Sequence, residues 1–388
     1  MARNAPEWNV LAFDGMVQFV PWRMEVARQW SEGRIPIANP WSFASDGGAP
    51  LLANGQSAVW YPPNALGVLF GADNLPVLSG WLVLFHLILL SVGTTRLSAA
   101  LGCSRVGTWI SGVAVSLSAC VVSWVSLPTH LATFTWLPWM LLAIHRSTPL
   151  RAGLFAGLIV LGGHLQIAAY VLAIGIGYAL LHRPIKESRI QACAVGSITF
   201  LAIALPQLLP VLELGRLGHR GGVAPTEAGY QAYIANAIPW HHAATWVFPD
   251  FYGSPSAPGG EWLVGSSGLT NHYAEWALYL GVPTIWLAIV ACLVPQRELD
   301  PAARRFRMVA QGGLALCILL AFGTPLNRVA YYLVPGFAAT GNPGRCMIVG
   351  TFLIAMLAGI GASHLSRRRV TLAGAGIGRL ALLAAVAG

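Results

Sequence analysis

The residue near the start of the chain that is best suited to chemistry is Asp14. Gln18, Trp22 and Glu25 follow it at near-helical spacing, although Pro21 must interrupt any continuous helix. A carboxylate with amide and aromatic neighbours can accept a proton from a hydroxyl group while those neighbours hold a polar headgroup. The alternative is an exposed or helix-capping Asp in a loop. The spacing leaves both interpretations open.

A second polar group lies between residues 36 and 64, where amides and indoles stand in a proline-rich stretch. Its amide side chains include Asn39, Asn54 and Gln56. Uncharged amides can orient a sugar or a lipid headgroup through hydrogen bonds, and aromatic rings can stack on the apolar faces of sugars. The same residues also suit a rigid structural loop. These residue types do not separate the two roles.

The composition requires lipid as the solvent for much of the chain. Of 388 residues, 56% are hydrophobic and only 10% are charged, and the mean hydropathy is +0.63. We therefore predict an all-α, polytopic integral membrane protein. The apolar stretches run over 75–95, 106–126, 131–144, 152–181, 190–212, 273–294, 308–322, 345–365 and 370–388.

The stretch 152–181 is long enough for either one oblique helix or a hairpin of two short helices. The links at 145–151 and 182–189 are both basic, so both are expected on the cytoplasmic side, and an even number of crossings must separate them. We therefore predict a hairpin that turns at residues 162–166. The total becomes about ten transmembrane helices.

Charges of opposite sign are sorted along the chain. Of the 23 basic residues 14 lie in short links between apolar stretches, whereas 11 of the 14 acidic residues lie in 1–74 and 213–275. This distribution predicts four parts: an extracytoplasmic region (1–74), transmembrane helices 1–6 (75–213), a long extracytoplasmic loop (214–272) and transmembrane helices 7–10 (273–388). Because the arginines lie between helices and form no single face, nucleic-acid binding is excluded.

The first polar region contains a predicted amphipathic helix. Proline and glycine delimit the stretch from Pro21 to Gly33, and Trp22, Val26 and Trp30 share one helical face. We expect this helix to lie on the outer membrane surface. No hydrophobic helix precedes residue 75, and the chain stops inside an apolar run, so we expect the membrane domain to continue beyond both ends.

Six segments carry a likeness to a known family: FDGMVQFVPW (13–22), GRIPIANPWSFASDGGAPLLANGQSAVWYPPN (33–64), GGHLQIAAY (162–170), PQLLPVLELGRLGHRGG (206–222), EWALYLGVP (275–283) and PGFAATGNPGRCMIVG (335–350). In this combination and order the chain resembles the YfhO-like bacterial membrane proteins, which belong with the GT-C type of lipid-linked-sugar glycosyltransferases. The likeness spans almost the entire chain. It implies a GT-C-like fold in a bacterial cell membrane.

The resemblance also implies an outward-facing active site that moves a sugar from a polyprenyl (undecaprenyl) phosphate carrier to an envelope glycan or teichoic-acid-like acceptor. In GT-C enzymes an acidic residue of the first outer loop acts as the base, and Asp14 is the matching position, with inversion expected. An arginine should hold the leaving phosphate, and the candidates are Arg345 and Arg220. Arg345 could instead anchor its helix at the membrane interface.

Other polar residues at predicted helix ends have two interpretations each. Glu275 could be a second acid, a metal ligand or a carboxylate that stabilises a helix N-terminus. A divalent metal ion shared by Asp14 and Glu275 is therefore a hypothesis. His164 and Gln166 at the predicted hairpin turn either line a substrate cavity or form capping hydrogen bonds.

Two other functions compete with glycosyl transfer. A transporter or flippase for lipid-linked sugars needs a polar path, but apart from His86 and Glu213 the predicted helices carry almost no ionisable residues at mid-depth. A non-catalytic membrane protein of envelope assembly is the third hypothesis, because degenerate family members retain the likeness. The sequence favours the enzyme over the transporter.

Overall fold

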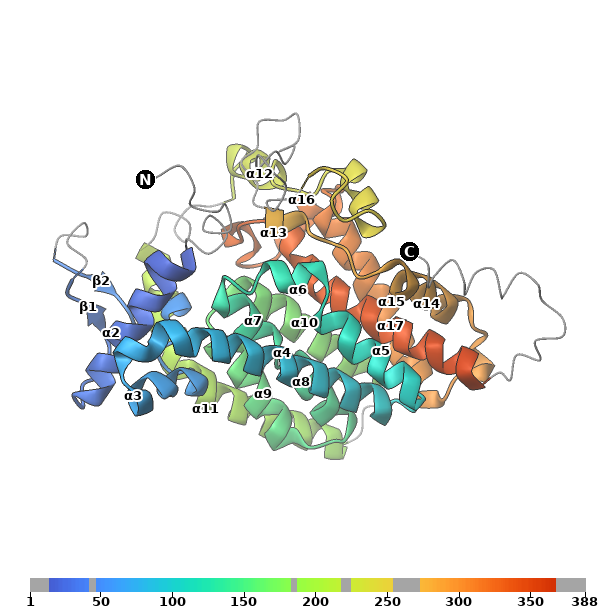
Figure 1. Cartoon of the computed structure of the whole chain (residues 1–388), viewed down its shortest axis with the longest axis horizontal. Coiled ribbons are helices and arrows are strands. Elements are labelled where there is room, and N and C mark those ends of the chain that lie inside the picture. The colour runs from blue at the N-terminus through green and yellow to red at the C-terminus, as the bar shows by residue number, and fades with distance from the viewer. Residues whose placement is uncertain (1–13, 42–46, 183–186, 218–224, 254–272, 368–388) are drawn as a thin grey trace.

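The computed structural model describes residues 14–41, 47–182, 187–217, 225–253 and 273–367, and it is almost entirely helical (Figure 1). Two short strands, β1 (Ala38–Asn39) and β2 (Ala49–Pro50), pair antiparallel. The helices are α2 (Val20–Ser31), α3 (Leu66–Phe70), α4 (Leu75–Ala100), α5 (Arg105–Ser116), α6 (Ala119–Ser123), α7 (Pro128–Phe134), α8 (Leu137–His145), α9 (Pro149–Leu161), α10 (Leu165–His182), α11 (Glu187–Leu217), α12 (Glu227–Ile234), α13 (Tyr273–Trp276), α14 (Val282–Leu293), α15 (Pro301–Ala321), α16 (Leu326–Leu333) and α17 (Met347–Arg367).

The described helices confirm the all-α, multi-pass membrane class. Five are long and apolar enough to cross a bilayer, or six if α15 and α16, bent by 89°, count as one span. The five are Ala72–Ala100, Arg105–Ser123, Leu165–His182, Ile190–Leu217 and Pro343–Arg367. Within the described residues, fewer helices than the predicted ten meet the length and composition of a full crossing, because several predicted stretches fold as shorter, broken helices. The predicted stretch 370–388 lies outside the described residues.

The break points follow from local residue chemistry. The stretch 131–144 is divided into α7 and α8, each of which begins with a proline that suits a first helical turn. The stretch 273–294 is divided into α13 and α14, and Gly281, with a φ of +88°, lies immediately before the start of α14. The predicted hairpin is confirmed, since α9 ends at Leu161 and α10 begins at Leu165.

Helix α17 lies at the centre of the bundle and is buried along nearly its whole length. Helices α5 and α14 approach it closely because glycines line the crossings. A Cβ at Gly361 would lie 2.0 Å from the Leu287 carbonyl oxygen, and one at Gly107 would lie 2.2 Å from the Gly359 carbonyl oxygen. Small residues allow such close packing in membranes, where burial supplies little driving force between helices. Helix α11, by contrast, is largely exposed.

The helix that follows Asp14 corrects one prediction. Residues Gly15–Phe19 form a π-helical turn that continues directly into α2, so Pro21 does not interrupt the helix. Proline has no backbone N–H and cannot donate the hydrogen bond of a regular α-helix. In the π-turn the hydrogen bonds already follow a wider pattern, so Pro21 is accommodated there. A single helical stretch therefore connects Asp14 with Ser31.

Helix α2 occupies the stretch that was predicted as an amphipathic helix, but its buried face includes polar and charged side chains, and its apolar residues pack against protein. Val26 is buried together with Leu51 and Val59, and Trp22 and Trp30 pack against this cluster. The loop after β2 thus lies on the face that was expected to contact the membrane. Protein, and not lipid, buries this stripe.

The region predicted as a long loop, 214–272, is partly helical where the structure describes it. Helix α11 extends to Leu217, and α12 and the 3-10 helix Trp240–Trp246 (η6) follow. Helix α12 packs on α16 through a cluster of three buried tyrosines, Tyr230, Tyr233 and Tyr331. The start of α12 has a local cause, since Thr226 caps the helix by accepting a hydrogen bond from the Gly229 N–H.

Three of the short links between apolar stretches, those at Gly102, Asp300 and Arg367, lie together. Arg367, at the end of α17, contacts Asp300 over 3.0 Å and donates a hydrogen bond to the Gly102 carbonyl. In Figure 1 this end of α17 lies at the right, whereas α2 and the two strands lie at the left. The polar residues discussed next belong to the end away from this contact.

Candidate functional site

An ion pair between Arg345 and Glu275 forms the centre of the candidate site. The Arg345 Nε and Nη2 atoms donate to Glu275 Oε1 over 2.8 and 2.6 Å. The Glu275 side chain is only 5% exposed, whereas that of Arg345 is 26% exposed. Within the described residues, Glu275 Oε2 is buried without a hydrogen-bond partner. The pair therefore leaves one carboxylate oxygen able to accept a hydrogen bond.

Gln166 is a second side chain that binds the Arg345 guanidinium. The Asn342 side chain accepts a hydrogen bond from the Gly344 N–H over 2.8 Å and starts the 3-10 turn Pro343–Cys346 (η9) that carries Arg345. Gln166 donates to the Asn342 carbonyl over 2.8 Å, and Arg345 Nη1 donates to Gln166 Oε1 over 3.4 Å. Residues from α10, α13 and η9 thus meet at one side chain.

An aromatic stack lies beside the ion pair. The Arg345 Cζ atom is 5.7 Å from the centre of the Trp124 ring, which stacks on His130 with centroids 4.1 Å apart and an angle of 8°. His130 in turn lies 4.0 Å from His164 between ring centroids. The His164 Nδ1 atom accepts a hydrogen bond from the Ile167 N–H, so His164 also caps α10. The capping interpretation of His164 therefore has a structural basis, and its place beside a substrate stays a prediction.

Asp14 lies at the start of the helical stretch, half-buried, and makes no capping hydrogen bond there. The neighbouring Gly15 packs on the connection between α6 and α7, because a Cβ at Gly15 would lie 2.9 Å from the Ser126 carbonyl oxygen. The same connection carries Trp124 only two residues earlier. Asp14 therefore lies near the connection that carries Trp124, whose ring faces Arg345. Gln18, four residues after Asp14, is exposed.

The amides of residues 36–64 serve their own loop. Asn39 Oδ1 accepts a hydrogen bond from the Trp41 N–H over 3.0 Å, and Asn54 Oδ1 accepts one from the Gln56 N–H over 3.2 Å. Gln207 of α11 donates to the loop backbone over 2.6 Å. The side chain of Gln56 is exposed. These contacts favour the structural interpretation of this loop.

A close backbone contact joins that loop to the hairpin turn of the site. Gly163 has a φ of +98°, and a Cβ there would lie 2.7 Å from the Gly55 carbonyl oxygen. A side chain at this position would both strain the backbone and displace the loop. The loop is thereby held against the turn that carries His164 and Gln166.

Arg23 is a buried cation that the sequence analysis did not identify. It is 4% exposed, and within the described residues its Nε has no hydrogen-bond partner. Tyr61 and His86 are near enough to interact with it electrostatically. Burial lowers the pKa of Arg23 to about 10, with a partial offset from Tyr61. Arg23 therefore remains charged at neutral pH.

Two further expectations concern Arg220 and a metal ion. Arg220 lies outside the described residues. Over the same described part, no three His, Cys, Asp or Glu side chains gather as a metal site would require. The observed partner of the Glu275 carboxylate is the Arg345 guanidinium.

His242 adjoins the site through Trp276, the neighbour of Glu275. Its ring stacks on Tyr252 at 4.3 Å and meets Trp276 edge-on at 4.4 Å between centroids. Burial lowers the pKa of His242 to about 4, and the adjacent His241 contributes. An unfolded histidine has a pKa of about 6.5, so between these values the unfolded chain binds more protons.

We therefore predict that the folded protein loses stability as the pH falls from about 6.5 to about 4, and that His242→Phe removes part of this loss. Thermal unfolding midpoints of the purified protein in detergent, measured across this range, test the prediction. His241→Phe, next to it in the chain, is the control and should leave most of the pH dependence in place. Parallel profiles for the wild type and His242→Phe would contradict it.

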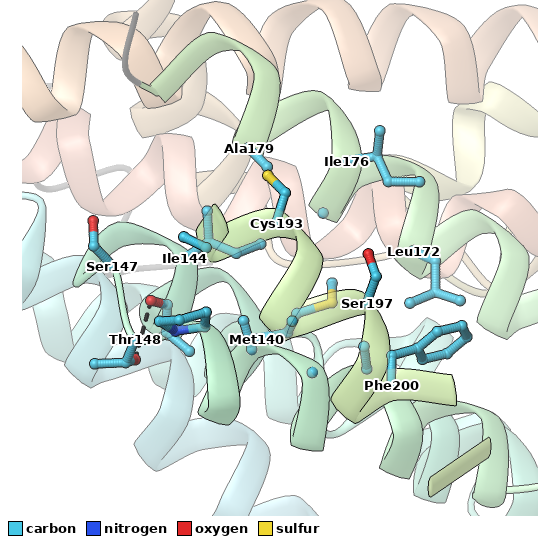
Figure 2. A pocket seen from close by; sticks show the side chains of 18 of the residues that line it. Met140, Ile144, Ser147, Thr148, Leu172, Ile176, Ala179, Cys193, Ser197 and Phe200 are labelled. Carbon is cyan, nitrogen blue, oxygen red and sulfur yellow. Dashed lines mark hydrogen bonds between the residues drawn. The ribbon is translucent and has the colours of Figure 1, made fainter. Parts of the chain in front are cut away.

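A separate cavity of about 910 Å³ lies between α8, α9, α10 and α11. Figure 2 shows apolar side chains such as Met140, Leu172 and Phe200 around it, with Thr148 donating to the Ala143 carbonyl over 3.2 Å at its edge. Among the residues that the structure describes, the lining contains no carboxylate and no arginine or lysine. We therefore place the candidate chemistry at the Arg345 cluster and not in this cavity.

Comparisons with known proteins identify one structural neighbour. No protein-family model and no curated protein matches the sequence. Among solved structures, the chain is similar to the crystal structure of ArnT from Cupriavidus metallidurans bound to undecaprenyl phosphate. The TM-score is 0.37 and the sequence identity 13%, over 94% of this chain and 79% of that chain.

Proposed function

We propose that this chain is a membrane glycosyltransferase that moves a sugar from a polyprenyl phosphate carrier to a hydroxyl group of a cell-envelope acceptor. One observation carries the proposal. Three segments with the family likeness, 162–170, 275–283 and 335–350, supply Gln166, Glu275 and Arg345, and Arg345 bonds to both other side chains although the three are distant in sequence. A fourth segment, 13–22, packs at Gly15 on the Ser126 backbone, two residues after Trp124, whose ring faces Arg345.

In the proposed reaction, Asp14 acts as the base. The acceptor oxygen attacks the anomeric carbon while the bond between that carbon and the phosphate oxygen breaks. Asp14 accepts the hydroxyl proton, and the polyprenyl phosphate leaves from the opposite face, so the anomeric configuration inverts. The half-buried position of Asp14 suits a group that must meet both an aqueous acceptor and a lipid-linked donor.

The Arg345 cluster is proposed to hold the sugar. Because Glu275 neutralises the guanidinium, the pair presents hydrogen-bonding groups without net charge. Glu275 Oε2 can accept a hydrogen bond from a sugar hydroxyl, and Gln166 keeps the arginine oriented.

Asp14→Asn tests the proposal. We expect it to lower sugar transfer by about 10²–10⁴-fold, the range in which a general base contributes, with donor binding retained. The measurement is transfer of radiolabelled sugar from undecaprenyl-phosphate-linked donors to envelope fractions by the purified protein in liposomes. Asp73→Asn, an exposed acid of the same region, is the matched control and should transfer normally.

Two results would contradict the proposal. Unchanged transfer by Asp14→Asn would remove Asp14 as the base. Movement of labelled lipid-linked sugar across the liposome bilayer, without transfer to any acceptor, would favour a transporter.

A further inference from the structure

We propose that Arg23 is the anion-binding residue of a phosphate site beneath α2, and that its ligand is the phosphate group of a lipid-linked carrier. The choice of a lipid carrier rests on the proposed function. The anion itself is inferred independently, from the absence of a counter-ion for Arg23 in the described structure.

The other arginines of α2 and of the turn after it are paired. Arg28 forms an ion pair with Glu25, and Arg34 forms one with Glu32. Arg23 differs from these arginines, because it is 4% exposed and no ion pair involves it within the described residues. The most deeply buried cation of this helix is thus the one without a carboxylate.

The polar groups near Arg23 are occupied by other partners. His86 Nδ1 lies 2.5 Å from the Leu82 carbonyl, so it carries the proton, and His86 Nε2 accepts from the Tyr61 hydroxyl over 2.6 Å. Trp136 Nε1 donates to the same hydroxyl over 2.9 Å. This network is complete without Arg23. Its neighbours therefore leave the guanidinium donors available.

A buried guanidinium without a counter-ion is unfavourable, so a charge of opposite sign is expected in the working state. The planar guanidinium donates through several N–H groups at once, so it matches the oxygens of a phosphate better than a cation that makes a single contact. Arg345 is less suited to this task, because Glu275 already binds its Nε and Nη2 atoms. Arg23 provides the uncompensated positive charge that a leaving phosphate requires.

The position of Arg23 also agrees with the proposed reaction. Nine residues of one helical stretch separate it from Asp14, which is roughly 13 Å along a helix axis. One helix would position both groups.

The test is binding of undecaprenyl phosphate to the purified protein in detergent micelles, with uncharged undecaprenol and inorganic phosphate as separate probes. For Arg23→Gln we expect a dissociation constant for undecaprenyl phosphate at least about ten-fold higher, as for loss of a charge-assisted hydrogen bond. Undecaprenol binding should not change. Arg34→Gln, an exposed arginine paired with Glu32, is the control and should bind as the wild type does.

A thermal measurement separates ligand binding from a structural role. In the absence of ligand, Arg23→Met should unfold at the same temperature as the wild type or at a higher one, because it removes an uncompensated buried charge. Undecaprenyl phosphate should raise the unfolding temperature of the wild type but not that of Arg23→Met. A lower ligand-free temperature together with an unchanged ligand effect would overturn the inference.

The outcomes also distinguish this inference from the proposed function. Arg23-dependent binding of undecaprenyl phosphate by a protein that transfers no sugar would refute the transferase and retain the phosphate site. An equal effect of inorganic phosphate alone would overturn the lipid carrier as the source of the phosphate. Asp14→Asn should bind undecaprenyl phosphate normally, since it lacks only the base.

Discussion

Replacement of Glu275 by alanine is expected to destabilise the folded protein by about 3 kcal/mol, because it leaves the partly buried Arg345 without its carboxylate. The Glu275 side chain is 5% exposed and binds two nitrogens of the guanidinium, so water cannot fully replace it. Unfolding midpoints in detergent, with denaturant or heat, measure the loss.

A double-mutant cycle separates the pair from general damage. Glu275→Ala combined with Arg345→Met should be less destabilised than the sum of the two single variants, because the double variant leaves no isolated charge. The exposed pair Glu227–Arg328 is the matched control, and Glu227→Ala should change stability far less than Glu275→Ala, because water replaces the lost partner of an exposed charge. Equal losses for Glu275→Ala and Glu227→Ala would show that the central pair contributes no more than a surface pair.

Gly361→Ala is expected to reduce stability by about 3 kcal/mol, although alanine favours helices. The added Cβ would lie 2.0 Å from the Leu287 carbonyl oxygen and 3.1 Å from the Ala291 backbone nitrogen. These are backbone atoms of α14, so no side chain can move aside, and the helices α14 and α17 must separate.

Gly312 of α15 provides the control, since no atom lies within 4 Å of a Cβ built there. Gly312→Ala should leave stability unchanged or raise it by up to about 1 kcal/mol, because alanine has the higher helix propensity. Unfolding midpoints and gel-filtration profiles of both variants test the pair. The close crossing would be refuted if Gly361→Ala behaved like Gly312→Ala.

The membrane class and most helix positions could be predicted because their causes are local. The apolar stretches 75–95 and 345–365 became α4 and α17, and the basic links beside residues 152–181 indicated the hairpin whose turn contains Gly163. In a bilayer the backbone must satisfy its own hydrogen bonds, so a sufficiently apolar stretch forms a helix whatever lies beside it.

Several details could not be predicted because they depend on the surroundings. Pro21 was expected to break the first helix, but a π-turn accommodates it. Trp22 and Trp30 were expected to face lipid, but the loop containing Leu51 covers their helix face. Periodicity identifies an apolar face and does not identify what buries it.

The sequence by itself determined that the protein is a helical membrane protein with charges sorted between its two ends, since composition and local hydrogen bonding decide both. Only the tertiary structure decided which polar residues meet. The polarity of Glu275 and Arg345 was visible in the sequence, but their contact spans 70 residues and depends on the rotation of each helix. The isolation of Arg23 is likewise a property of packing, because a cation lacks a partner only in relation to the side chains around it.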